Sequence, residues 1–274
     1  MKLMVVDGNS ILNRAYYGIR PLSTREGLYT HAVYGFITTL QRLLDEEEPE
    51  ALCVTFDRKA PTFRHKMDDG YKATRHGMPD ELAQQMPVMK DVLRAMRIPI
   101  FECEGWEADD VIGTLAHKGV EAGYDVFMVT PDKDYGQLVC DNCKIYKQKG
   151  NDGIEIVGRE AIREKYGIEP PQLIDVKSLM GDASDNIPGV PGIGEKTALA
   201  LISKFGSLQG VYDNIDDKAV KPGQRAKLTA NRDKADLSYM LGTIRKDAPI
   251  ETDPAAYLRQ PGDPAAAAQL LAAL

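Results

Sequence analysis

The sequence has little of what soft-metal sites, disulfide scaffolds and membrane spans require. Its 274 residues include four cysteines and four histidines. Only Cys140 and Cys143 have a C-x-x-C spacing, and a zinc site needs more ligands than this pair. No apolar run approaches the roughly 18 residues of a membrane span, and the N-terminal segment reaches Asp7 too early for a signal peptide. We therefore expect a cytoplasmic protein without a membrane partner, whose cysteine pair is either redox-active or simply two reduced thiols flanking the start of a strand.

The sequence also has fewer basic than acidic residues, 34 against 41, and thus a formal charge of −7. The sum alone argues against a nucleic-acid partner, but the distribution of charge matters more. If nine acids bind metal, the remaining residues carry a formal charge of +2. The overall composition is that of a soluble globular protein, and the length allows a sizeable core with a smaller second domain.

Short apolar runs, each followed by acidic residues, recur along the first half of the chain. These runs and their acids are 3–6 with Asp7, 51–56 with Asp57, 98–101 with Glu107, and 125–129 with Asp132 and Asp134. Apolar residues at helical spacing predict helices over 11–17, 31–44, 80–96 and 109–123. This alternation predicts an α/β domain with a mainly parallel sheet, in which the carboxyl ends of the strands form the ligand site.

The second half contains one further strand pair and is otherwise helical. Segments 144–148 and 154–157 flank Gly150-Asn-Asp-Gly153, which predicts an antiparallel hairpin at the sheet edge. Helices are expected at 159–166, 171–180, 195–204, 207–214, 223–229, 234–243 and 263–274. We predict two domains: an α/β domain over residues 1–177 and a smaller helical domain over 178–274.

The stretch Gly105-Trp-Glu-Ala-Asp-Asp110 carries three acids at the start of a predicted helix. One interpretation is structural, because carboxylates near a helix N-terminus are favoured by the helix dipole and can cap the first turn. The other is that these acids bind a metal, since carboxylate oxygens are the ligands that Mg²⁺ takes. The recurrence of acids after other strands favours the second interpretation.

Residues 58–76 interrupt this pattern with a polar insert of net charge +4. A solvated loop would explain the composition. A loop of this length inside a compact domain is unusual, however, and such loops are often functional. Within the insert, Lys72 and Arg75 are three residues apart, which would place them on one helical face.

Nine acids are candidates for one site: Asp7, Asp57, Glu107, Asp109, Asp110, Asp132, Asp134, Asp182 and Asp185. Carboxylates gathered at one edge would repel one another strongly unless cations neutralise them. Two divalent cations, Mg²⁺ or Mn²⁺, held roughly 4 Å apart are an arrangement that hydrolyses phosphodiesters. The shortage of suitably spaced His and Cys argues against zinc. The sequence thus predicts a two-metal site.

Six segments carry a resemblance that covers about residues 2–248. They are Val6-Asp-Gly-Asn-Ser10, Phe56-Asp57, Tyr71-Lys-Ala-Thr-Arg75, Glu107-Ala-Asp-Asp110, Asp132-Lys-Asp134, and the run from Gly181 through Gly194 into Glu195-Lys-Thr-Ala198. With them the chain closely resembles the 5′-nuclease (flap endonuclease) family, in particular the N-terminal 5′→3′ exonuclease domain of bacterial DNA polymerase I. The resemblance implies a PIN-like central sheet, a helical arch over about 58–97 and a C-terminal helix-hairpin-helix (H3TH) subdomain.

The resemblance also implies roles for individual residues. Asp7, Asp57, Glu107, Asp109 and Asp110 would serve mostly the first metal, and Asp132, Asp134, Asp182 and Asp185 the second, with Asp109 and Asp132 as catalytic residues. Lys72 and Arg75 would stabilise charge on the scissile phosphate, and Tyr71 would stack on a base near the cut. The hairpin would grip the duplex backbone, commonly with a K⁺ ion. Its predicted contacts are Gly189, Val190, Gly192, Ile193, Gly194, Lys196 and Thr197.

The implied function is structure-specific hydrolysis of DNA by a monomer that removes 5′ flaps and RNA primers in replication and repair. Its substrates would be 5′ flaps, overhangs and nicks, held through backbone contacts, in the bacterial cytoplasm at the nucleoid. Polymerase domains could be linked to it in a full-length protein. Two alternatives are open: a PIN-like RNase, against which the hairpin and the insert count, and a non-catalytic branched-DNA-binding module, against which the complete acid set counts.

Overall fold

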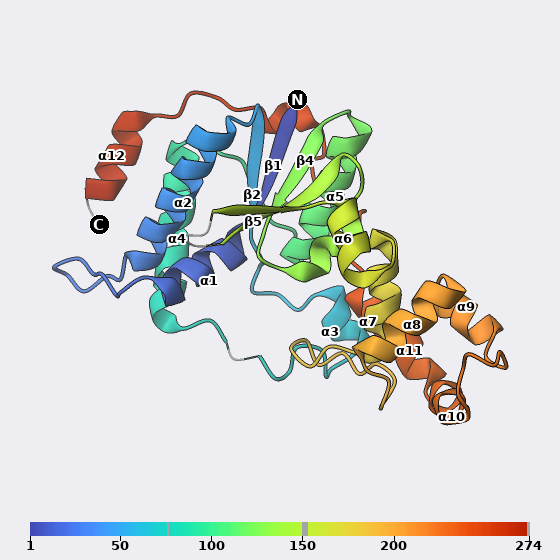
Figure 1. Ribbon diagram of the computed structural model, residues 1–274. Helices are drawn as coiled ribbons and strands as arrows, with labels where there is room; N and C mark the ends of the chain where they lie inside the picture. Colours follow the sequence, from blue (N-terminus) through green and yellow to red (C-terminus); the bar gives the residue numbers. More distant parts are fainter. Residues whose placement is uncertain (76, 150–152, 273–274) are drawn as a thin grey trace.

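The computed structural model describes residues 1–75, 77–149 and 153–272, and its centre is a six-stranded sheet (Figure 1). The strands are β1 (Lys2–Asp7), β2 (Ala51–Thr55), β3 (Ile100–Phe101), β4 (Asp125–Val129), β5 (Cys143–Gln148) and β6 (Ile154–Val157). Their order is β3-β2-β1-β4-β5-β6, and all neighbours are parallel except β5 and β6. The predicted mainly parallel sheet with an antiparallel edge hairpin is confirmed, while the predicted turn at 150–152 lies outside the described residues.

Helices cover both faces of this sheet because its strands are apolar on both sides. In β1, Leu3 and Val5 face one side, Met4 and Val6 face the other, and all four are at most 2% exposed. The first side packs against α5 (Ala108–Glu121). The second packs against α1 (Gly8–Gly18), α2 (His31–Glu47) and α4 (Asp80–Ala95). The carboxyl ends of the strands remain as the open edge.

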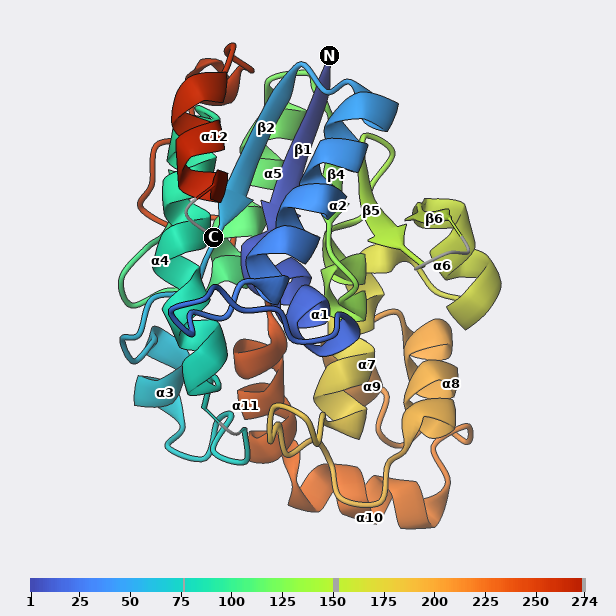
Figure 2. The ribbon, with the colours of Figure 1, turned by 90° about the vertical axis from the view of Figure 1, so that its left-hand side faces the viewer.

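A second group of helices forms its own core beyond those carboxyl ends (Figure 2). It comprises α7 (Leu173–Met180), α8 (Glu195–Phe205), α9 (Leu208–Asp213), α10 (Pro222–Ala230) and α11 (Arg232–Gly242), which α6 (Arg159–Tyr166) and a 3-10 turn, η3 (Pro170–Gln172), precede. The predicted domain boundary at residue 177 falls within α7 and stays a prediction. None of the described helices has the length and apolar character needed to cross a membrane.

From α11 the chain returns to the α/β layer. The Ala248 N–H donates to Thr114 Oγ1 of α5 at 3.0 Å, and a second 3-10 turn, η4 (Pro254–Tyr257), follows. The last helix, α12 (Pro264–Ala272), lies along α4 (Figure 2). Helix α12 therefore packs on the α/β layer rather than on the second group of helices.

The basic insert consists mainly of turns. Its one helix within the described residues is α3 (Phe63–Met67), and residues 69–75 form turns. Lys72 has a left-handed φ of 55°, a conformation that a right-handed helix does not contain. The prediction that Lys72 and Arg75 share a helical face is therefore wrong.

Candidate metal and nucleic-acid site

The carboxyl edge of the sheet gathers acids from neighbouring strands. Asp7 ends β1, and its carboxylate accepts the Ser10 N–H and the Thr130 hydroxyl, each at 2.9 Å. Asp57 follows β2 and accepts the N–H of Ala108, the first residue of α5, at 2.7 Å. Asp7 thus connects the end of β1 to α1 and to the end of β4, and Asp57 connects the end of β2 to the N-terminus of α5.

The acids at the start of α5 have two different environments. Glu107 is the N-cap and forms a capping box with Asp110, whose Oδ2 accepts the Glu107 N–H at 3.3 Å. Asp109 instead accepts the hydroxyl of Tyr135, which lies in a 3-10 turn, η1 (Lys133–Leu138), at 2.6 Å. Both interpretations of the acidic stretch thus have support: two of its acids cap the helix, and the third lies toward the acids that follow β4.

Crowding raises the pKa of three carboxyl groups. Burial and then the charge of Asp109 raise the pKa of Asp7 to about 7 and that of Asp57 to about 6. Burial and the charge of Asp134 raise the pKa of Asp132 to about 6. We call Asp7, Asp57, Asp109 and Asp132 the first acidic group. The raised pKa values of Asp7, Asp57 and Asp132 result first from burial and then from negative neighbours, an environment that a divalent cation stabilises.

Asp134, Asp182 and Asp185 form the second acidic group, in which one carboxylate oxygen of each lies within 4.8 Å of the others. Lys177 of α7 is buried beside them, pairs with Asp134 and lies 2.8 Å from Asp182. Burial opposes ionisation of Asp182, but the hydrogen bonds from Lys177 and Ser184 and the charge of Lys177 together outweigh it and lower the pKa to about 2. Arg75 pairs with Asp185. The second acidic group is thus already provided with cations.

Arg64 of α3 is a buried cation at the centre of this region. Its side chain is 2% exposed, and its guanidinium donates to both oxygens of Asp110, at 2.6 and 2.8 Å, and to Glu107 at 3.1 Å. It also donates to the carbonyls of Leu241 in α11 and Thr243 just beyond it. Asp110 is fully buried and accepts two backbone N–H groups as well. Both carboxylate oxygens of Asp110 therefore already accept hydrogen bonds from donors within the chain.

Tyr71 and Lys72 both contact Glu107. Lys72 Nζ lies 2.8 Å from Glu107 Oε1, and the Tyr71 hydroxyl donates to Glu107 Oε2 at 3.0 Å. The Tyr71 ring is 4% exposed and lies edge-on to His65, so its stacking on a base stays a prediction. The N–H of Lys72 donates to the Asp185 carbonyl at 2.9 Å. The insert is thus bonded both to the start of α5 and to the second acidic group.

The site as a whole has excess negative charge. Five of the nine predicted acids pair with four cationic side chains, namely Arg64, Lys72, Arg75 and Lys177. Nine carboxylates against four cations leave a formal excess of five negative charges. The donors are carboxylate oxygens, and within the described residues the one group of three or more metal-type ligands is acidic. Hard divalent cations such as Mg²⁺ or Mn²⁺ fit this donor set.

The hairpin at 189–194 presents backbone rather than side chains. Gly189 and Gly192 have left-handed φ values of 57° and 79°, and a Cβ on Gly189 would lie 2.3 Å from a backbone nitrogen. Val190 and Ile193 are buried in the core of the C-terminal helices, and their N–H groups donate to the carbonyls of Leu179 and Val190, so their contact with DNA stays a prediction. Gly194 is the N-cap of α8 and supplies no side-chain cap. The first N–H groups of α8 are therefore available to an anion.

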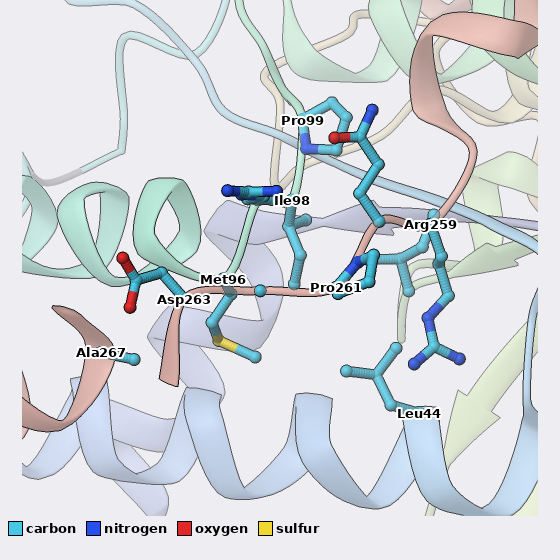
Figure 3. Close-up of a pocket in the computed structure, with 12 residues that line it drawn as sticks. Leu44, Met96, Ile98, Pro99, Arg259, Pro261, Asp263 and Ala267 are labelled. Atoms are coloured by element: carbon cyan, nitrogen blue, oxygen red, sulfur yellow. The ribbon is translucent and has the colours of Figure 1, made fainter. Parts of the chain in front are cut away.

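A cavity of about 340 Å³ lies apart from these residues, between the segment at 259–263, α2 and the end of α4 (Figure 3). Leu44, Met96 and Ile98 line it with Pro261. None of the nine acids and none of the predicted DNA contacts is among its lining residues. It is thus a separate, largely apolar feature.

Sequence reasoning missed four residues that support the site: Arg64, Thr130, Tyr135 and Lys177. Thr130 and Tyr135 border the Asp132–Asp134 segment, so nearness in the sequence was an available signal. Lys177 is the one basic residue of α7 and stands five residues before Asp182, and a lone cation in a mostly apolar helix suggests a buried partner. Arg64 offered no comparable signal, because its partners lie 43 and 46 residues away.

Known proteins resemble this chain in both sequence and fold. Residues 2–167 match the family described as 5′-3′ exonuclease, N-terminal resolvase-like domain, and residues 168–265 match 5′-3′ exonuclease, C-terminal SAM fold. DNA polymerase I of Bacillus caldotenax is 45% identical over 253 residues, which are 91% of this chain and 28% of that protein. The chain therefore spans less than a third of the length of this curated relative.

Two solved structures show the same fold. T5 5′-exonuclease with bound divalent metal ions (zinc) has a TM-score of 0.73 at 24% identity, covering 88% of this chain and 89% of that one. The catalytic core of Rad2 in complex with DNA substrate has a TM-score of 0.66 at 18% identity, covering 98% and 86%. The predicted PIN-like α/β fold with a C-terminal helical subdomain is confirmed. Together with the sequence matches, this shows that the chain belongs to the 5′-3′ exonuclease family.

Proposed function

We propose that this chain is a structure-specific 5′ nuclease that hydrolyses DNA phosphodiesters with the help of two divalent cations, Mg²⁺ or Mn²⁺. The observation that carries the proposal is the pair of acidic groups at the carboxyl edge of the sheet, where the nine predicted acids have a formal excess of five negative charges over their cationic partners. Carboxylates crowded to this degree bind cations. Two such cations in one site are used for phosphodiester hydrolysis.

Eight of the nine acids would hold the cations: Asp7, Asp57, Glu107, Asp109, Asp132, Asp134, Asp182 and Asp185. Asp110, the ninth predicted ligand, would act differently. Its oxygens are occupied by Arg64 and backbone N–H groups, so we propose that it positions Arg64 and the start of α5. Bound cations would polarise the scissile phosphate and lower the pKa of the attacking water.

The basic side chains of the insert, Lys72 and Arg75, would stabilise charge on the scissile phosphate. Lys72 pairs with Glu107, and Arg75 pairs with Asp185, so each stands beside a proposed metal ligand. When a phosphate enters, these side chains can exchange a carboxylate for a phosphate oxygen and offset its developing negative charge. Asp109 and Asp132 of the first acidic group, the latter beside Asp134 of the second, would help to hold the reacting atoms in place.

The hairpin and the start of α8 would hold duplex DNA through its backbone. The N–H groups of Gly192, of Gly194 and of the start of α8 suit phosphate oxygens, whereas those of Gly189, Val190 and Ile193 already donate within the chain. The exposed Lys196 and the half-buried Thr197 stand beside them. Contacts of this kind carry little sequence information. A K⁺ ion between carbonyls and phosphate would strengthen them. The substrates would be 5′ flaps, overhangs and nicks, including RNA primers on DNA. The nuclease would act as a monomer at the bacterial nucleoid, and polymerase domains could be linked to it in a longer protein.

Cleavage of a 5′-labelled flap duplex tests the proposal. We expect metal-dependent product that EDTA abolishes, and a loss of at least about 100-fold in Asp132→Ala, as for removal of one electrostatic group from an active site. Asp125→Ala is the matched control. Asp125 is exposed and is the first residue of β4, whereas Asp132 follows the other end of that strand. Equal activity in both variants would contradict the assignment.

The same assay separates the alternatives. A PIN-like RNase would cleave an RNA hairpin faster than the flapped DNA. A non-catalytic module would bind the flap equally with and without metal and give no product. Our proposal requires turnover on the flap and a preference for it over the RNA hairpin.

A further inference from the structure

Cys140 and Cys143 face each other across a two-residue turn between η1 and β5. The N–H of Cys140 donates to the carbonyl of Cys143 at 2.9 Å, and the reverse bond is 3.3 Å. The Cα atoms of such a hydrogen-bonded antiparallel pair lie about 5.5 Å apart, with both side chains on one face. Disulfides most often have Cα separations of about 5.5–6 Å. The backbone therefore already has the spacing that a disulfide needs.

The two thiols have unequal environments. Cys140 is exposed, whereas Cys143 is 2% exposed. A hydrogen bond from the Cys143 side chain, which outweighs partial burial, lowers the pKa of Cys140 to about 6, and the pKa of Cys143 is raised by the same bond and by burial. In the other two cysteines, Cys53 and Cys103, burial raises the pKa of the thiol. An accessible thiolate beside a buried thiol is the arrangement of an attacking and a resolving cysteine.

A metal site does not account for this pair. Among the described residues, the groups of three or more metal-type ligands do not include either cysteine. A cavity of about 250 Å³ beside the pair is also lined by His117 and Lys246. Two sulfurs alone fall short of the four ligands of a structural zinc site.

We propose that Cys140 and Cys143 form a reversible disulfide by exchange with small disulfides such as glutathione disulfide. The Cys140 thiolate attacks one sulfur of glutathione disulfide, forms a mixed disulfide and releases one glutathione thiolate. The Cys143 thiol gives its proton to that thiolate and attacks the Cys140 sulfur, releasing the second glutathione. The two protein thiols lose two electrons, and glutathione disulfide gains them. This modification site is independent of the proposed nuclease activity.

Mass spectrometry of the full chain after exposure to glutathione disulfide tests the proposal. We expect the wild-type protein to lose two hydrogen atoms, with the new bond mapped to Cys140 and Cys143, while Cys53 and Cys103 stay open to alkylation after unfolding. Added dithiothreitol should restore both thiols. A bond that involves Cys103, or no bond at all, would overturn the proposal.

Variants test the order of the two steps. Cys143→Ser, or Cys143→Ala if the serine variant unfolds, should keep one glutathione on Cys140, because no resolving thiol is present. Cys140→Ser should remain largely unmodified, since Cys143 is buried. Equal persistence of the adduct in wild type and Cys143→Ser would show that Cys143 does not resolve it, and the proposal would fail.

Discussion

The two acidic groups are built from the same residue type, yet they differ in how their charge is compensated. In the first, Asp7 and Asp57 lie near Asp109, and burial with this negative neighbour raises their pKa values to about 7 and about 6. In the second, Lys177 is placed among the carboxylates, and the pKa of Asp182 falls to about 2. Position in the fold thus decides whether an aspartate of this site is under-compensated or already paired.

The difference has a physical consequence for cation binding. A cation that enters the first acidic group meets unpaired charge and displaces protons. One that enters the second must compete with the ammonium of Lys177. We therefore expect unequal divalent-cation affinities at the two positions, and substitutions within either acidic group should alter that difference.

Arg64→Ala should have the largest effect, because it removes the cation that ties α5 to the end of α11. It leaves Asp110 buried with uncompensated charge, and such losses cost about 3–5 kcal/mol. Urea unfolding of the full chain measures the loss. Arg58→Ala is the control, since Arg58 is an exposed arginine of the same insert whose pair with Glu104 is also exposed. A loss below about 1 kcal/mol in Arg64→Ala would show that Asp110 does not depend on this partner.

Lys177→Met should make the second acidic group resemble the first. Asp134 and Asp182 lose their buried cation, so the metal-free protein should be destabilised by about 2 kcal/mol, less than for a fully buried pair because both acids are partly exposed. Mg²⁺ should stabilise the variant more than the wild type, since no ammonium competes. Melting with and without Mg²⁺ measures both effects. Equal stabilisation by Mg²⁺ in the two proteins would show that Lys177 does not compete with a cation in the second acidic group.

Lowering the pH should stabilise the metal-free protein. Asp7, Asp57 and Asp132 have raised pKa values in the fold, so the folded state binds more protons and stability is lost as pH rises from about 4 to about 7. Unfolding in EDTA should therefore need at least about 1 kcal/mol more at pH 5.5 than at pH 8, since one unit of pKa shift is about 1.4 kcal/mol. Asp182, with its pKa of about 2, weakens the fold only below this window. Asp7→Asn should reduce the dependence, and an unchanged slope would point to other groups.

Asp109→Asn should have the smallest effect on stability and the clearest effect on metal. It removes the charge that raises the pKa of its neighbours, so the metal-free protein should gain about 1 kcal/mol. Divalent cation affinity should fall by more than flap affinity does, because Asp109 is a proposed metal ligand while the proposed contacts to the duplex lie on the hairpin. Calorimetric titration and a filter-binding assay give the two values. An equal loss of both affinities would count against the proposed role of Asp109.

The sequence was sufficient to predict those features that depend on the order of neighbouring residues along the chain. An acid directly after an apolar run identifies the carboxyl end of a strand, and parallel strands bring such ends together, so the gathering of Asp7 and Asp57 was predictable. The antiparallel hairpin at the sheet edge followed from its strand pattern in the same way. Both inferences need only neighbours in the chain.

The remaining features depend on contacts between distant segments. Arg64 reaches Leu241 across 177 residues, and nothing in the local composition of the insert distinguishes it from Lys66. The helical placement of Lys72 failed because a single left-handed residue overrides a spacing rule. Burial of Tyr71 likewise depends on packing against Ile187 and Leu241, which only the folded chain brings near.

The bonds of Arg64 also make the insert and the C-terminal helices mechanically continuous. One guanidinium spans α3, the first turn of α5 and the end of α11, so a displacement of the insert is transmitted to the helices that carry the hairpin. The contributions of the insert and of the hairpin region to the free energy of flap binding should then be non-additive. A double-mutant cycle of flap affinity between Lys72→Ala and Lys196→Ala should give a coupling energy of about 0.5 kcal/mol or more. The same coupling energy should vanish in an Arg64→Ala background.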